Sequence, residues 1–91
     1  MDIYIENEKG ISLQAWLDYV SRDKELVLSE SGGGINPITK QKLRIQIPGR
    51  VLFGDSEIIY WNSRIGSNDY SEELVAKMKE IAKAFDAEFF E

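Results

Sequence analysis

Three short segments of the chain contain residue types that could take part in chemistry. Gly54-Asp55-Ser56 places a serine hydroxyl, a potential nucleophile, beside a carboxylate. Asp55 and Glu57 are two carboxylates separated by one residue, and such a pair could bind Mg²⁺ or act in acid–base catalysis. Ser31-Gly32-Gly33-Gly34 is a glycine run whose backbone N–H groups could hold a phosphate.

The rest of the composition argues against catalysis at these segments. The 91 residues include no histidine and no cysteine, so the usual general base, the thiol nucleophile and the common ligands of zinc, copper and haem are missing. The glycine run also lacks the Gly-Lys-Ser/Thr ending of a P-loop. We therefore expect no enzyme activity, no cofactor and no metal site. We interpret residues 54–56 as a turn, Asp55 and Glu57 as solvated carboxylates, and residues 31–34 as a flexible connection.

A basic strand is the most informative feature of the sequence. Residues 43–47 alternate between apolar and polar types, as a half-buried strand does, with Leu43, Ile45 and Ile47 toward the helices. The opposite face would carry Lys40, Lys42, Arg44 and Gln46, and Arg50 follows just after Pro48-Gly49. If the helices cover one side of the sheet, these bases form a positive stripe that can meet phosphate or an acidic protein. The alternative is a solvated edge strand that its lysines protect from aggregation.

The net charge of −5 is distributed unevenly along the chain. Residues 1–30 and residues 67–91 each have seven acids and three bases, whereas residues 31–66 have five bases and two acids. A basic island with a net charge of +3 thus lies between two flanks of −4 each. Such asymmetry is informative about partners and association rather than about fold.

Apolar residues at helical spacing predict two amphipathic helices. A helix over about 12–21, capped by Ser12, has its stripe in Leu13, Trp16, Leu17 and Val20. A second helix over about 70–85 has its stripe in Leu74, Met78, Ile81 and Phe85, and either Asp69 or Ser71 could cap it. We interpret Trp16, Met78 and Phe85 as core residues rather than as the lining of a ligand pocket.

The remaining segments predict the strands and the fold class. Strands are expected at residues 2–6, 25–29, 43–47, 50–53, 57–61 and 87–90, with a further short strand at 64–65. Pro48-Gly49 is expected to join two of them as a hairpin. Tyr60 and Trp61 must face opposite sides of their strand, so one belongs to the core and the other can be exposed. The expected class is α+β, a single domain over residues 1–91. It has a mainly antiparallel sheet of about five to six strands, two helices on one face and the order β-α-β-β-β-(β)-α-β.

The sequence also sets expectations for location and assembly. No apolar run approaches the roughly 20 residues that span a bilayer, and residues 1–6 lack the features of a signal peptide. We therefore expect a cytoplasmic protein that does not enter the membrane. An exposed strand edge could support a homodimer, so a monomer and a homodimer both remain open.

Four segments, namely residues 11–20, 23–28, 36–39 and 77–83, together resemble a group of short bacterial proteins of unassigned function. Some small α+β proteins of this type are similar to the immunity partners of secreted bacterial toxins, which bind a toxin and block it. The resemblance covers most of the chain and implies a cytoplasmic binding protein. It assigns no functional residues.

These observations predict a non-catalytic protein-binding module of the toxin-immunity type. Immunity proteins against nucleases are often acidic because their targets are basic, and complementary charge speeds association. The candidate contacts are then the outer residues Asp18, Glu25, Glu73 and Glu80. The alternative is a weak binder of nucleic acid or another anionic ligand, which would use Lys40, Lys42, Arg44 and Arg50, with an exposed aromatic such as Trp61 for stacking.

Overall fold

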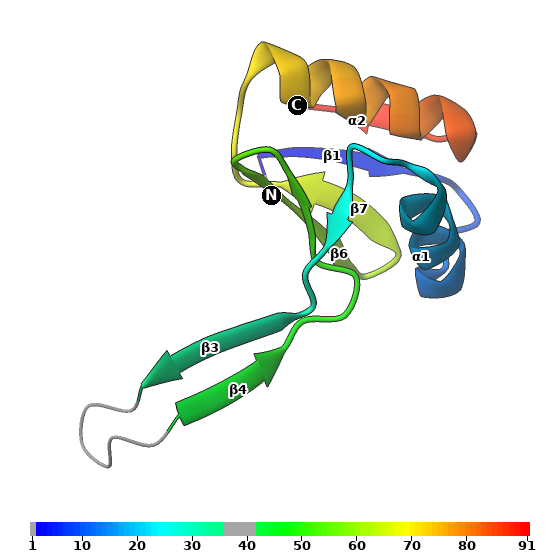
Figure 1. Cartoon of the computed structure of the whole chain (residues 1–91). Coiled ribbons are helices and arrows are strands. Elements are labelled where there is room, and N and C mark those ends of the chain that lie inside the picture. Colours follow the sequence, from blue (N-terminus) through cyan, green and yellow to red (C-terminus); the bar gives the residue numbers. More distant parts are fainter. Residues whose placement is uncertain (1, 36–41) are drawn as a thin grey trace.

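The computed structural model describes residues 2–35 and 42–91, and it divides the molecule into two parts. Figure 1 shows a sheet with its helices, from which a two-stranded ribbon projects. Residues 31–46 are hereafter the arm, and residues 2–30 with 47–91 are the body. The fold is α+β, as the sequence predicts, and the predicted order of helices and strands is confirmed.

The body contains a six-stranded antiparallel sheet with the spatial order β2-β5-β6-β7-β1-β8. Its strands are β1 (Ile3–Glu6), β2 (Val27–Leu28), β5 (Val51–Phe53), β6 (Ser56–Trp61), β7 (Arg64–Ser67) and β8 (Glu88–Phe90). The arm forms a separate two-stranded antiparallel sheet of β3 (Ser31–Ile35) and β4 (Lys42–Gln46).

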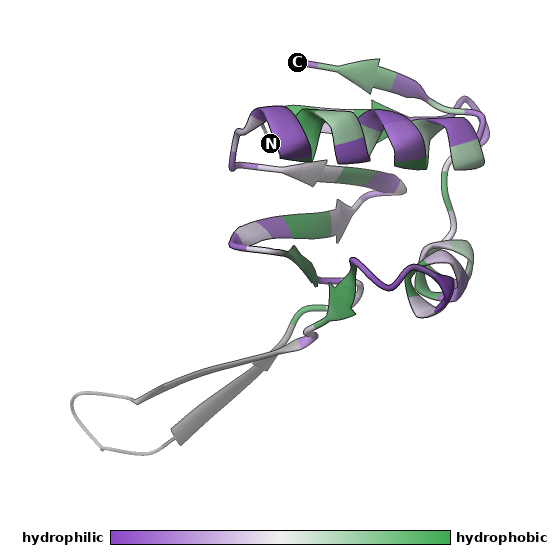
Figure 2. Cartoon of the chain, turned by 45° about the horizontal axis from the view of Figure 1, so that its top comes forward, coloured by the Kyte–Doolittle hydropathy of each residue, from purple (hydrophilic) through white to green (hydrophobic). Residues whose placement is uncertain are grey.

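Both predicted helices are present and begin at serine caps. The first helix, α1 (Leu13–Arg22), begins after Ser12, whose Oγ accepts a hydrogen bond from the Ala15 N–H at 3.1 Å. The second, α2 (Glu72–Ala84), begins after Ser71, whose Oγ accepts from the Leu74 N–H at 3.0 Å. Ser71 is therefore the cap rather than Asp69, because the side chain of Asp69 instead accepts from the Glu57 N–H. Figure 2 shows α2 as alternating hydrophilic and hydrophobic segments, as an amphipathic helix requires.

The core lies between one face of the body sheet and the two helices. Alternate strand residues are buried there: Ile3, Ile5, Val51, Ile58 and Ile65. The helices contribute Trp16 and Val20 from α1 and Leu74, Met78 and Ile81 from α2. The Phe85 ring lies 6.4 Å from that of Trp16 and 5.4 Å from that of Tyr19, so the two helices meet over the same face. The predictions of a shared helical face and of a core role for Trp16, Met78 and Phe85 are confirmed.

Tyr60 and Trp61 face opposite sides of β6, as predicted. Tyr60 packs against the core, and its hydroxyl donates to the carbonyl of Ile11 at 2.6 Å. Trp61 is 69% exposed on the other side of the sheet, hereafter the open face. Among the described residues, no helix combines the length and apolar character needed to cross a bilayer.

The predicted hairpin at Pro48-Gly49 is wrong, because β4 pairs with β3 and β5 pairs with β2 and β6. Hydrogen bonds from Ser29 N to Arg50 O and from Ile47 N to Glu30 O continue the pairing between the body and the arm. Pro48-Gly49 therefore bends one long strand instead of reversing it. Turn-forming residues permit a bend of this kind, and the more distant partner strand decides the pairing.

Two expectations about the arm are also wrong. The glycine run is not a flexible connection but most of β3, with Gly32 opposite Ile45, Gly33 opposite Arg44 and Gly34 opposite Leu43. The strand that contains Leu43 and Ile45, β4, was expected in the helix-covered sheet but belongs to the separate two-stranded sheet. Glycine has a low intrinsic strand preference, but pairing with an adjacent strand overrides it.

Candidate binding surface

A cleft on the body gathers three carboxylates from segments far apart in the sequence. It has a volume of about 530 Å³ and is lined by Glu25, Phe53, Gly54, Asp55, Ser56, Ser71 and Glu73. Glu25, Asp55 and Glu73 are all exposed, and none of the described residues lining the cleft is basic. This group, hereafter the acidic cleft, combines three carboxylates, of which Glu25 is paired with Lys77, with an aromatic wall at Phe53.

Local structure positions the backbone of each of the three acidic residues. Glu25 follows α1 in a turn that Asp23 stabilises, since the Asp23 carboxylate accepts from the Glu25 N–H at 2.9 Å. Asp55 lies in the turn between β5 and β6, where Gly54 has a φ of +58°. Glu73 belongs to the capped first turn of α2, where negative charge also favours the helix dipole.

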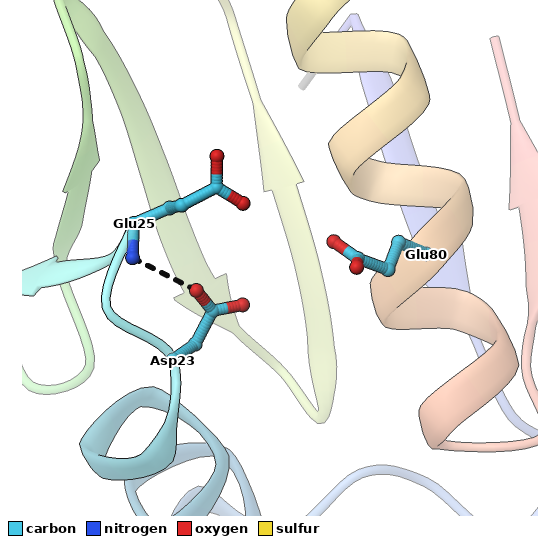
Figure 3. Close-up of side chains that lie close together, drawn as sticks. All are labelled: Asp23, Glu25 and Glu80. Atoms are coloured by element: carbon cyan, nitrogen blue, oxygen red, sulfur yellow. Dashed lines mark hydrogen bonds between the residues drawn. The ribbon is translucent and has the colours of Figure 1, made fainter.

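A buried lysine lies beside the acidic cleft and shares Glu25 with it. The Lys77 side chain is 4% exposed, and its Nζ lies 2.6 Å from Asp23, 2.8 Å from Glu25 and 2.9 Å from Glu80. Figure 3 shows how these three carboxylates converge from the turn after α1 and from α2. The Lys77 Nζ also lies 5.8 Å from the centroid of the Phe53 ring, which forms the wall of the acidic cleft.

The ionisation of this Lys77 cluster follows from its contacts. Burial alone lowers the pKa of Lys77, but hydrogen bonds to Asp23, Glu25 and Glu80 outweigh burial and raise that pKa well above its usual value. Burial alone raises the pKa of Asp23, and the hydrogen bond from Lys77 outweighs it, so that the Asp23 pKa is lowered. Burial and the charge of Glu80 raise the pKa of Tyr19. At neutral pH the cluster is thus an ammonium held by carboxylates.

The same three carboxylates have the spacing of a metal site, because their oxygen atoms lie within 4.8 Å of one another. The Lys77 ammonium, however, contacts all three groups and supplies the positive charge between them. The arrangement therefore ties α2 to the turn between α1 and β2. Two members of the cluster, Glu25 and Glu80, keep side-chain exposures of 65% and 61% and remain accessible to a partner.

The acidic residues predicted as contacts are only partly brought together. Glu25 and Glu73 line the acidic cleft, and Glu80 lies in the adjoining Lys77 cluster. Asp18 is exposed on α1, where it accepts from Gln14 Nε2 at 3.0 Å, and it lines neither group. Asp55 and Glu57 are separated in role, because Asp55 lines the cleft while Glu57 forms an ion pair with Arg50.

The described basic residues that were predicted as contacts lie in both the arm and the body. Lys42 and Arg44 occupy alternate positions of β4, opposite Ile35 and Gly33, and Lys40 lies outside the described residues. Arg50 belongs to the body, where it pairs with Glu57 and donates to Ser29. Trp61 lies on the open face of the body sheet. Lys42 and Arg44 thus belong to the arm, whereas Arg50 and Trp61 belong to the body.

The Lys77 cluster is absent from the sequence predictions, although the sequence contains a signal for it. Lys77 stands three residues after Leu74 and four before Ile81, within the apolar stripe of α2. A lysine at a core position needs carboxylate partners, since an unpaired buried charge is costly. Any exposed lysine on α2 could complement the helix dipole, whereas the Lys77 side chain is only 4% exposed. Its buried position gives it a different and more specific role.

Comparisons with protein-family models, with curated proteins and with solved structures give no match for this chain.

Proposed function

We propose that the chain is a non-catalytic protein-binding module of the bacterial toxin-immunity type, acting in the cytoplasm, and that its acidic cleft binds a basic partner protein. The observation that carries this proposal is the convergence of Glu25, Asp55 and Glu73 around Phe53 without a basic residue among the described lining. The resemblance to small immunity proteins supports the class. The lack of histidine and cysteine supports binding rather than catalysis.

The chemistry of the acidic cleft fits a lysine or arginine side chain. Asp55 and Glu73, together with Glu25, which is shared with Lys77, would attract such a cation, and the Phe53 ring could contact its aliphatic stem or its charged end. The buried Lys77 fixes Glu25 at the border of the cleft and thereby pre-organises one of the three acids. Complementary charge at such a surface increases the association rate and makes it sensitive to salt.

Affinity purification from the organism that encodes the chain tests this proposal with two double variants of equal charge. Asp55→Lys with Glu73→Lys reverses the charge of two residues that line the cleft. Glu88→Lys with Glu91→Lys reverses the charge of two exposed residues elsewhere. A basic protein captured by the wild type and by the second variant should be lost from the first, with affinity reduced about 100-fold or more in calorimetry. Equal binding by both variants, or capture of no basic protein, contradicts the proposal.

A second candidate function is weak binding of nucleic acid or another anionic ligand through the arm. It is favoured by the charge of residues 31–46, which include three bases and no acid, and by the projection of β3 and β4 from the acidic body in Figure 1. Fluorescence anisotropy with single-stranded RNA at low salt checks it. Binding that disappears in the variant Lys42→Glu with Arg44→Glu supports this function, and no binding at low salt eliminates it.

A further inference from the structure

An uncovered strand edge runs from the body into the arm. β2 is the last strand of the body sheet, and β3 follows it after Ser29 and Glu30. The bonds from Ser29 N to Arg50 O, at 2.9 Å, and from Ile47 N to Glu30 O, at 2.6 Å, keep this linker paired with the neighbouring strand. Residues 27–35, hereafter the free edge, therefore form one extended path. No strand in the described part of the chain pairs with its outer side.

The free edge lacks the features that usually prevent sheets from joining. Its nine residues contain no lysine, arginine or proline, and their one charged residue is Glu30. The Glu30 carboxylate accepts from the Gly49 N–H at 3.1 Å, which directs it toward the neighbouring strand instead of outward. Val27 and Leu28 are 59% and 45% exposed. The outer side thus offers backbone N–H and C=O groups that no lysine, arginine or proline protects from pairing, and exposed apolar side chains lie beside them.

We propose that two copies of this chain associate through their free edges, with residues 27–35 of one copy pairing antiparallel with residues 27–35 of the other. A two-fold axis near Ser31 places Val27 of one copy opposite Ile35 of the other. Such an interface is self-complementary, as cyclic dimers require. It joins both body sheets and both arms into one continuous sheet. The proposal goes beyond the partner binding proposed above and does not depend on it.

Charge complementarity identifies the second copy as the occupant. Residues 31–46 carry three bases and no acid, whereas the rest of the chain carries sixteen acids and eight bases. Antiparallel pairing brings the arm of one copy, with its charge of +3, alongside β2 of the other copy. Two acids lie beside the Val27 end of that strand: Glu25, two residues before Val27, and Asp55, in the turn that follows β5. Symmetry repeats this attraction at both ends of the interface.

The arm also gains from such pairing. A two-stranded ribbon alone is marginally stable in water, and three or more strands are usually needed for independent stability. Pairing of two free edges places β3 of each copy beside β2 of the other copy, so each two-stranded arm extends a six-stranded body sheet. The glycines of β3 lack side chains, so another strand can approach this part of the edge without steric hindrance.

Sedimentation velocity of the purified full chain tests the proposal. The wild type should be a dimer whose dissociation constant increases with salt, because opposite charges contribute to its interface. The variant Val27→Lys with Leu28→Lys adds charge at two exposed edge positions and should raise that constant at least about 100-fold. Its far-ultraviolet circular dichroism should stay unchanged.

Trp61→Lys is the matched control, because Trp61 is exposed on the open face and away from the free edge. This variant should remain a dimer. A wild type that is monomeric up to about 1 mM, or an edge variant that still dimerises, overturns the proposal. Dissociation by Trp61→Lys alone would overturn it too, since it would assign the interface to the open face. The sedimentation sample contains this chain alone and no other protein. A monomeric wild type would therefore overturn the dimer without affecting the test of the acidic cleft.

Discussion

The body and the arm are both antiparallel sheets, but they differ in what stabilises their strands. Body strands bury one face against two helices, so Ile5, Ile58 and Ile65 are each fully buried. Each such side chain contributes roughly 1.5–3 kcal/mol, whereas a typical backbone hydrogen bond contributes about 1 kcal/mol net. The arm strands pair with each other outside this helix-covered sheet. Folding stability should therefore reside in the body, which leaves the arm available for association.

Gly49 lies at the junction of the two regions and provides the strongest way to disturb their connection. Its φ is +77°, and a Cβ added there would lie 2.8 Å from Tyr60 Cβ and 2.9 Å from Leu13 Cδ1. Its carbonyl accepts from Trp16 Nε1 at 2.8 Å, which anchors the bend to the buried face of α1. Gly49→Ala should lower the free energy of unfolding by about 3 kcal/mol, measured by urea denaturation.

Gly54→Ala separates the steric part of this effect from the backbone part. Gly54 also has a positive φ, of +58°, but a Cβ added there would have nothing within 4 Å. The free energy of unfolding of this control variant should fall by only about 1 kcal/mol, because backbone strain alone acts on it. Equal losses for the two variants would show that crowding at the junction is unimportant.

The same contrast explains which parts of the fold the sequence could predict. The helices were predictable because caps and apolar spacing are local signals, as with Ser12 before Leu13, Trp16 and Val20. The pairing of β4 with β3 was not, because Pro48-Gly49 has the local chemistry of a turn. The structure uses these residues as a bend that Trp16 and Glu30 hold from distant positions. Strand preference is weak compared with such long-range contacts.

The candidate site shows the same division. Glu25 and Glu73 were identifiable as outer acids, but their convergence with Asp55 depends on how three separated segments pack. Lys77 carried a readable signal, since it interrupts an apolar stripe. Its partners Asp23 and Glu25, more than fifty positions earlier, could not be assigned without the fold. A sequence can thus indicate that a buried charge needs partners before it can identify them.

Asp23 allows the stability of the body to be probed by pH. Its pKa is lowered from the usual 3.8, so its contribution to stability is present above that value and is lost as the pH falls through the lower folded pKa. Asp23→Asn removes the charged partner of Lys77 and should cost about 2 kcal/mol near neutral pH. The difference in unfolding free energy between wild type and variant should become smaller below about pH 4. Chemical denaturation at a series of pH values measures it.

Asp18→Asn is the control for this titration, because Asp18 is an exposed acid on α1 outside the Lys77 cluster. At neutral pH its unfolding free energy should stay within about 0.5 kcal/mol of that of the wild type. If Asp23→Asn showed the full acid dependence of the wild type, the hydrogen bond from Lys77 could not be the cause of the lowered pKa.

Shortening the arm should have the smallest effect on folding and the clearest effect on assembly. Ser31 and Gln46 are cross-strand partners, so an Asn-Gly turn can replace residues 32–45 between them. The unfolding free energy of the monomer, measured by denaturation at low protein concentration, should change by less than about 1 kcal/mol because the buried core described for the body is retained. Sedimentation should show a monomer, since residues 32–35 of the free edge and all three arm bases are gone. A large loss of stability would instead mean that the arm is part of the cooperative folding unit, and body and arm would then differ in shape but not in energetic role.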